Sequence, residues 1–136
     1  GVSGFKGKAV GVDTGSTGAM WATTHQKDYG YTIREYVGLN AAMLDLKNGR
    51  IDGYISDIPA LQYYAKTTGG VQVIERLKTG EQYSIMFAKN NALAGQFNAQ
   101  LDLMKRSGYL SALHKKWFGV EPEKTTSTAT VLPMPK

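Results

Sequence analysis

The sequence predicts a mixed α/β fold: a mostly parallel sheet with helices on both faces, in three layers. In the first half of the chain, apolar β-forming runs alternate with stretches of helical periodicity. Single helices between such runs give right-handed β-α-β units, whose strands are parallel. Glycine, asparagine or proline stands at many of the boundaries, where these residues end strands or helices.

The first half is predicted to contain four strands, at residues 8–12, 31–37, 51–57 and 71–74. One helix follows the small-residue turn 13–18, where Ser16 or Thr17 is placed to cap it. A second begins at an Asn40 cap and stops at Asn48 and Gly49. A third runs from Pro59 to Lys66, with proline in its first turn.

The second half is predicted to hold one strand, 83–88, and two helices, 93–106 and 109–117. Residues 120–136 contain three of the four prolines and a threonine-rich run, which predicts an extended or disordered, flexible tail. Three large aromatic residues lie in helical settings and are expected to pack in the core rather than to bind a ligand: Trp21, Trp117 and Phe118.

Composition excludes several classes of function. The formal charge is +5, but the 16 basic residues are scattered, which does not predict a nucleic-acid-binding stripe. Without cysteine there is no thiol chemistry, and His25 and His114 lack metal-ligand spacing, so neither metal nor cofactor is expected. No apolar run approaches the roughly 20 residues that span a bilayer, and Gly1 to Lys8 lack a signal-peptide core, so we expect a soluble chain without its targeting segment.

Two polar clusters are predicted at the carboxyl ends of strands, where parallel sheets bind their ligands. One is the turn 14–18, in which the Thr17 hydroxyl and the helix N-terminus could bind an anion. The other is the Ser56 and Asp57 pair. In the competing interpretation, Ser16 and Thr17 only cap their own helix, and Asp57 caps the helix that starts near Pro59.

Several short motifs, in order, resemble one family, the polar amino-acid-binding proteins of ATP-driven importers, which have the type II periplasmic-binding-protein fold. The matching segments are residues 7–12, 15–18, 45–53, 56–57, 79–83, 108–110 and 116–119. Each segment alone is weakly diagnostic. Their order and spacing over residues 4 to 119 make the resemblance specific.

Members of this family have two lobes joined by two crossing strands, and they bind the amino acid between the lobes. The resemblance implies that residues 1–80 form the second, ligand-binding lobe, and that 81–119 supply the hinge strand and carboxy-terminal helices of the first lobe. The rest of that first lobe has no counterpart here. We therefore expect either an excised or proteolytic piece of a longer protein, or a natural half-length protein.

The resemblance also implies roles for individual residues. Asp57 matches the aspartate that accepts the ligand's ammonium group, and Thr17 lies where a hydroxyl turns toward the carboxylate. Asp13 matches the position that faces the ligand's side chain, which favours a cationic ligand such as arginine, lysine or ornithine. Asp13 could equally bond the turn amides of Gly15 and Ser16.

Further binding residues are expected beside these: Ser16, Ser56 and Gln82. Gln82 and Tyr83 match the second hinge crossing, where residues control lobe opening. The expected function is that of an extracytoplasmic (periplasmic) receptor that passes a polar amino acid to an ABC permease without chemistry. A periplasmic dehydratase of the same fold is a weaker interpretation, because only Asp13 and Asp57 could serve as acid or base. A sensor domain reporting to a kinase or channel stays open.

A half-length chain also predicts how its second part behaves. The strand 83–88 and the helices after it would lack the rest of their lobe. We expect the strand to dock onto the chain's own sheet, or two copies to exchange their carboxy-terminal segments in a homodimer, unless another chain supplies a complementing first lobe. Ligand affinity should be weak or absent, because half of the charge partners are missing.

Overall fold

The computed structural model describes residues 1–81 and 83–133. The chain divides into two compact units, Gly1–Glu81 and Gln82–Lys136. Gln82, which the sequence analysis assigned to the hinge and the ligand site, lies outside the described residues.

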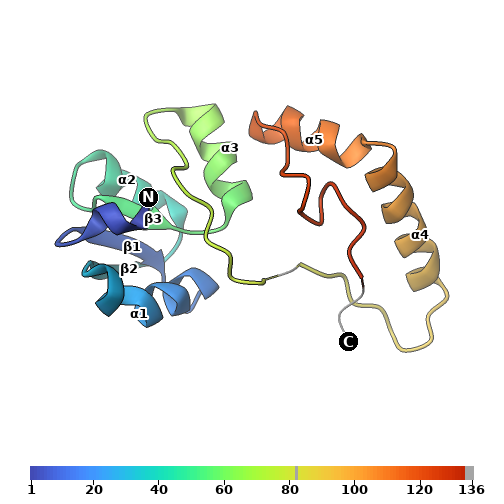
Figure 1. Cartoon of the computed structure of the whole chain (residues 1–136), viewed down its shortest axis with the longest axis horizontal. Coiled ribbons are helices and arrows are strands. Elements are labelled where there is room, and N and C mark those ends of the chain that lie inside the picture. Colours follow the sequence, from blue (N-terminus) through green and yellow to red (C-terminus); the bar gives the residue numbers. More distant parts are fainter. Residues whose placement is uncertain (82, 134–136) are drawn as a thin grey trace. The chain divides into compact units, whose positions relative to one another are not determined.

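The first unit is an α/β unit whose three strands are all parallel, in the order β2-β1-β3 (Figure 1). Its elements are the 3-10 helix η1 (Val2–Phe5), β1 (Ala9–Asp13), α1 (Thr17–Tyr29), β2 (Thr32–Tyr36), α2 (Leu39–Lys47), β3 (Gly53–Ile55) and α3 (Ile58–Thr68). The predicted α/β class with a parallel sheet is therefore confirmed. The short helix η1 was not predicted.

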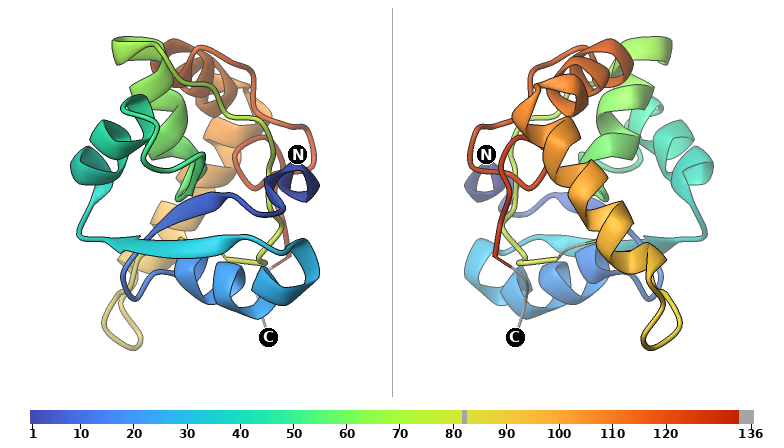
Figure 2. Two further views of the ribbon diagram at one scale, coloured as in Figure 1. Left: turned by 90° about the vertical axis from the view of Figure 1, so that its left-hand side faces the viewer. Right: turned by 90° about the vertical axis from the view of Figure 1, so that its right-hand side faces the viewer.

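The helices of the first unit cover both faces of the sheet. Figure 2 shows α1 on one side of the strands and α2 with α3 on the other. The strand order explains this arrangement, because the crossover from β1 to β2 and the crossover from β2 to β3 run in opposite directions along the sheet. Two right-handed crossovers in opposite directions place their helices on opposite faces. The predicted three layers are present.

The core of the first unit lies on both sides of β1. Toward α1, Val10 and Val12 pack against the small residues Ala19 and Ala22, with Tyr31 beside them. The Tyr31 hydroxyl donates to the backbone oxygen of Ala22 at 2.7 Å, so this buried polar atom has a partner. The remaining buried apolar side chains belong to α2 and the segment before β3: Ala42, Met43 and Ile51.

The first turn of α1 follows the prediction, and that of α2 does not. Ser16 is the N-cap of α1, and its hydroxyl accepts a hydrogen bond from the Ala19 amide at 3.0 Å. The predicted Asn40 cap is wrong, because α2 already begins at Leu39. Gly38 precedes that helix with φ 87°, a backbone conformation that glycine adopts at little cost.

An aromatic column lies along α1. The indole of Trp21 stacks on the His25 ring with 4.2 Å between centroids, and the Tyr29 ring lies 6.0 Å from the indole. Tyr29 in turn stacks on Tyr31, with 6.3 Å between centroids. Trp21 is half-buried in this column and does not belong to the buried core that the sequence predicted for it.

Two predicted strands are absent. Residues 71–74 and 83–88 have β-forming composition, but neither segment forms a ladder with a neighbour. β propensity mainly reports fit to a pleated surface, so it does not form a strand where no sheet edge receives it. The docking of 83–88 onto the chain's own sheet stays a prediction.

The second unit consists of α4 (Leu93–Arg106), α5 (Tyr109–Phe118) and irregular segments. The predicted bounds of α4 match, and Asn91 accepts a hydrogen bond from the Leu93 amide at 2.9 Å at its start. The indole of Trp117 is 52% exposed, which contradicts its predicted core packing, and Phe118 is half-buried. Residues 124–130 form hydrogen-bonded turns rather than extended chain, and the flexibility of this tail stays a prediction.

Candidate functional site

The carboxyl ends of β1 and β3 form one edge of the first unit's sheet. The two strands are parallel neighbours, with Val12 opposite Ile55, so the segments that leave them start side by side. Two contacts join these segments. The Ser56 hydroxyl donates to Asp13 Oδ2 at 3.2 Å, and a Cβ on Gly18 would lie 3.2 Å from the Ile55 carbonyl oxygen. The starts of α1 and α3 therefore share this edge.

The start of α1 carries two hydroxyl groups, those of Ser16 and Thr17, and only one of them caps the helix. Ser16 caps the helix, whereas the Thr17 hydroxyl donates to Glu81 Oε1 at 2.7 Å. A carboxylate thus lies at a helix N-terminus, where the helix dipole favours negative charge. Glu81 was not among the predicted site residues, although it stands in the matched segment 79–83.

Asp13 ends β1 and is half-buried. Its Oδ2 accepts the hydrogen bond from Ser56, while its Oδ1 is buried without a partner. The turn amide of Ser16 donates to the backbone oxygen of Asp13 at 3.1 Å, not to its carboxylate. The competing interpretation, in which the Asp13 side chain bonds the turn amides, is therefore not what the structure shows.

Tyr54 reaches the same edge and was missed by the sequence analysis. Its hydroxyl is buried and has no partner in hydrogen-bonding geometry. The pKa of this hydroxyl is raised, first by burial and then by its close approach to the Asp13 carboxylate, while Ser56 acts in the opposite direction, so the hydroxyl stays protonated at neutral pH. Strand alternation was the available signal, because the residue opposite Tyr54 is Gly11, two positions before Asp13.

Asp57 occupies the N-cap position of α3 and is exposed. Its side chain makes no capping hydrogen bond, while its backbone oxygen accepts from the Leu61 amide at 3.1 Å. The helix therefore does not use the carboxylate as its cap, and the capping interpretation is not supported. The structure places five predicted site residues at this edge: Asp13, Ser16, Thr17, Ser56 and Asp57. Tyr83 lies in the second unit and is 74% exposed.

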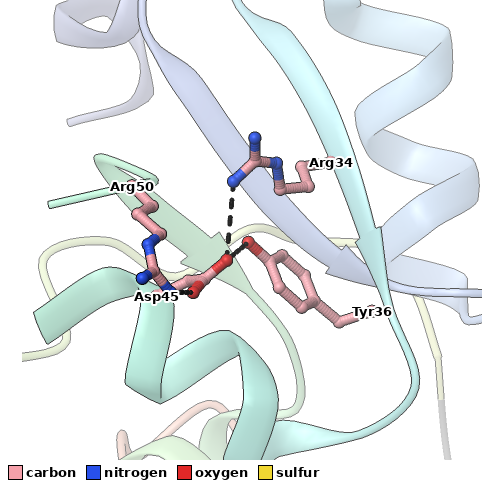
Figure 3. A network of polar contacts seen from close by, with 4 residues as sticks. All are labelled: Arg34, Tyr36, Asp45 and Arg50. Carbon is pink, nitrogen blue, oxygen red and sulfur yellow. Dashed lines mark hydrogen bonds and ion pairs between the residues drawn. The ribbon is translucent and has the colours of Figure 1, made fainter. Parts of the chain in front are cut away.

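A separate polar network includes two residues of the matched segment 45–53, Asp45 and Arg50 (Figure 3). Asp45 on α2 accepts hydrogen bonds from Arg50 at 2.8 Å and from the Tyr36 hydroxyl at 2.9 Å, with Arg34 at 3.5 Å. The Arg50 and Tyr36 hydrogen bonds lower the pKa of Asp45. The network connects β2 to α2 and to the segment between α2 and β3. Because both arginines are more than half exposed, it adds little stability.

Comparison with known proteins gives relatives of one kind. No protein-family model matches the chain. The L-cystine-binding protein of Escherichia coli (strain K12) is 31% identical over 122 residues, which are 88% of this chain and 45% of that protein. The ABC transporter arginine-binding protein 1 of the same strain is 31% identical over 125 residues, which are 84% of this chain and 49% of that protein.

A solved structure shows the same fold. An ancestral arginine-binding protein bound to arginine is 32% identical, with a TM-score of 0.62 over 87% of this chain and 54% of that chain. The chain spans about half the length of the curated relatives it matches. Over that half, the chain is similar to amino-acid-binding proteins of ABC transporters, and it has the type II periplasmic-binding-protein fold.

The names of the relatives describe binding proteins rather than enzymes, and two of those names place their proteins in the periplasm or outside the cell. Among the helices that the structure describes, none combines the length and the apolar character needed to cross a bilayer.

Proposed function

We propose that the protein is an extracytoplasmic receptor that binds a polar amino acid and delivers it to an ABC importer. In this proposal, residues 1–80 are one lobe of the receptor, and 81–119 contribute the hinge strand and terminal helices of the other lobe, the remainder of which lies outside this chain. The observation that carries the proposal is the shared edge, which gathers an exposed carboxylate, Asp57, and a helix N-terminus bearing the Thr17 hydroxyl.

These two groups suit opposite ends of a zwitterion. Asp57 would accept hydrogen bonds from the ligand's ammonium group, and Thr17 with the first amides of α1 would donate to its carboxylate. A charge-assisted hydrogen bond of this kind contributes about 1.5–3 kcal/mol. A second lobe that closes over the edge would exclude water and strengthen both contacts. The lone chain should therefore bind weakly.

The carboxylate of Asp13, at the same edge, would select the ligand's side chain. Its buried Oδ1 lacks a partner, and an unpaired buried carboxylate oxygen is costly. A cationic side chain would supply both the charge and the hydrogen-bond donor. A preference for arginine, lysine or ornithine over glutamine follows from this arrangement.

Loss of the Asp57 carboxylate tests the proposal. Calorimetry on the whole gene product, or NMR titration where affinity is millimolar, would compare Asp57→Asn with the matched variant Asp28→Asn, which removes a charge near the far end of α1. We expect Asp57→Asn to weaken arginine binding about tenfold or more and Asp28→Asn to leave it unchanged. If no amino acid binds to the unaltered protein, or if the two variants bind alike, the proposal fails.

A further inference from the structure

We infer that Tyr54 determines ligand specificity: its hydroxyl and Asp13 Oδ1 together form a side-chain seat for a ligand group that donates hydrogen bonds. We use the term side-chain seat for these two atoms. The inference rests on the proposed function, because it names the part of the same edge that distinguishes one amino acid from another.

The side-chain seat consists of two buried polar atoms that lie close to one another and make no well-formed hydrogen bond within the described residues. The Tyr54 hydroxyl and Asp13 Oδ1 are both inaccessible to solvent and lack hydrogen bonds among the described residues. A buried donor or acceptor left unsatisfied costs about 1–3 kcal/mol. Two such atoms side by side, at the edge where this fold class binds ligands, indicate a group that arrives from outside the chain.

The backbone fixes the position of this pair. In the ladder of β1 and β3, Tyr54 stands opposite Gly11. Glycine leaves room for the tyrosine ring, because a Cβ on Gly11 would lie 3.2 Å from Tyr54 Cδ2 and 2.7 Å from Ile51 Cδ1. Asp13 comes two residues after Gly11 on the same strand and therefore projects from the same face. The Tyr54 hydroxyl lies close enough to the Asp13 carboxylate for that carboxylate to contribute to its raised pKa.

Ser56 orients the carboxylate. Its hydroxyl donates to Asp13 Oδ2 at 3.2 Å, whereas Asp13 Oδ1 has no partner in hydrogen-bonding geometry. The two atoms of the side-chain seat then accept hydrogen bonds differently, since Asp13 Oδ1 is an anionic acceptor and the Tyr54 hydroxyl is a neutral oxygen that can also donate. A group with several N–H donors, such as guanidinium, satisfies both atoms at once. An alkyl side chain satisfies neither atom, and a carboxylate is repelled by Asp13.

A purely structural role for Tyr54 makes a different prediction. If Tyr54 only packs against β1 and donates to Asp13 in the bound state, removal of its hydroxyl should change stability and affect all ligands equally. The discriminating measurement is therefore the ratio of affinities for two amino acids, not the affinity for one.

Tyr54→Phe in the whole gene product provides the test, with Tyr36→Phe as the matched control. Tyr36 is the tyrosine on the neighbouring strand β2, and its hydroxyl donates to Asp45 instead. By calorimetry or NMR titration, Tyr54→Phe should weaken arginine binding about fivefold to tenfold and alanine binding less than about twofold. Tyr36→Phe should leave the ratio of the two affinities unchanged.

The double variant Asp13→Asn with Tyr54→Phe sharpens the result. If both side chains contact the same guanidinium group, the loss of arginine affinity in the double variant should differ from the sum of the two single losses. If arginine and alanine lose affinity equally in Tyr54→Phe, or if neither changes, the inference is overturned while the proposed receptor function survives. If the unaltered protein binds no amino acid, both are overturned together.

Discussion

The two units of the chain differ in what they bury. The first unit has a core in which Val12, Ala22 and Ala42 are fully shielded from solvent. In the second unit, no described residue is buried, and large apolar side chains are exposed, with Met86 at 93% and Leu103 at 60%. Both units were predicted from the same kind of local pattern. The difference shows that such a pattern specifies a helix but does not supply the surface that covers it.

The helices of the second unit make the point clearly. Both have the predicted bounds within a residue, and Gly108 and Gly119 flank α5 in the left-handed conformation typical of glycine. The neighbouring residues in the sequence are therefore sufficient to start and end both helices. Only a partner surface is missing, and in the proposed receptor the remainder of the first lobe would provide it.

The largest expected effect compares one isoleucine in each unit. Ile51 is 2% exposed in the first unit, and Ile85 is 61% exposed in the second. Ile51→Ala should lower the free energy of unfolding by about 2–5 kcal/mol because it leaves a cavity, whereas Ile85→Ala should change it by less than about 0.5 kcal/mol. Urea denaturation followed by circular dichroism measures both. Equal losses would contradict the contrast between the units.

A smaller effect concerns the edge of the first unit. Glu81 accepts the hydrogen bond of the Thr17 hydroxyl, so in the proposed receptor its carboxylate occupies the position meant for the ligand's carboxylate. Glu81→Ala should therefore raise amino-acid affinity, by about threefold to tenfold if it removes one competing hydrogen bond. Calorimetry measures this change, and the exposed Glu35→Ala on β2 is the control. A decrease in affinity would show that Glu81 helps to bind the ligand.

The smallest effect concerns association of the 136-residue chain. Because the exposed apolar side chains of the second unit lack cover, we predict that two copies exchange their carboxy-terminal segments. Size-exclusion chromatography with light scattering should then give a dimer, and Met86→Lys should shift it toward the monomer. A clean monomer at all concentrations would contradict the exchange.

The elements that local sequence determines were predictable. The cap at Ser16, the proline in the first turn of α3 and the bounds of α4 depend on neighbouring residues alone. The strands predicted at 71–74 and 83–88 were wrong because a strand depends on residues distant in the sequence. It requires a hydrogen-bonding neighbour, which β propensity does not provide. Asn40 is not the cap, because α2 begins at Leu39 and its N-cap position is Gly38, two residues before Asn40.

The site was predictable to the same extent. Strand ends in a parallel sheet share an edge, so the neighbourhood of Asp13, Thr17 and Ser56 follows from topology. Tyr54 and Glu81 were missed because their contacts depend on side-chain reach. The ring of Tyr54 extends past Gly11 toward Asp13, and Glu81 meets Thr17 across 64 positions of sequence.

The aromatic column of α1 has a practical consequence. The chain contains two tryptophans, and each unit carries one of them. Trp21 is stacked against His25 in the first unit, whereas Trp117 is 52% exposed in the second. Iodide should therefore quench the fluorescence of Trp117 much more readily than that of Trp21. Each unit thus carries its own optical reporter, and unfolding of one can be followed separately from the other without any added label.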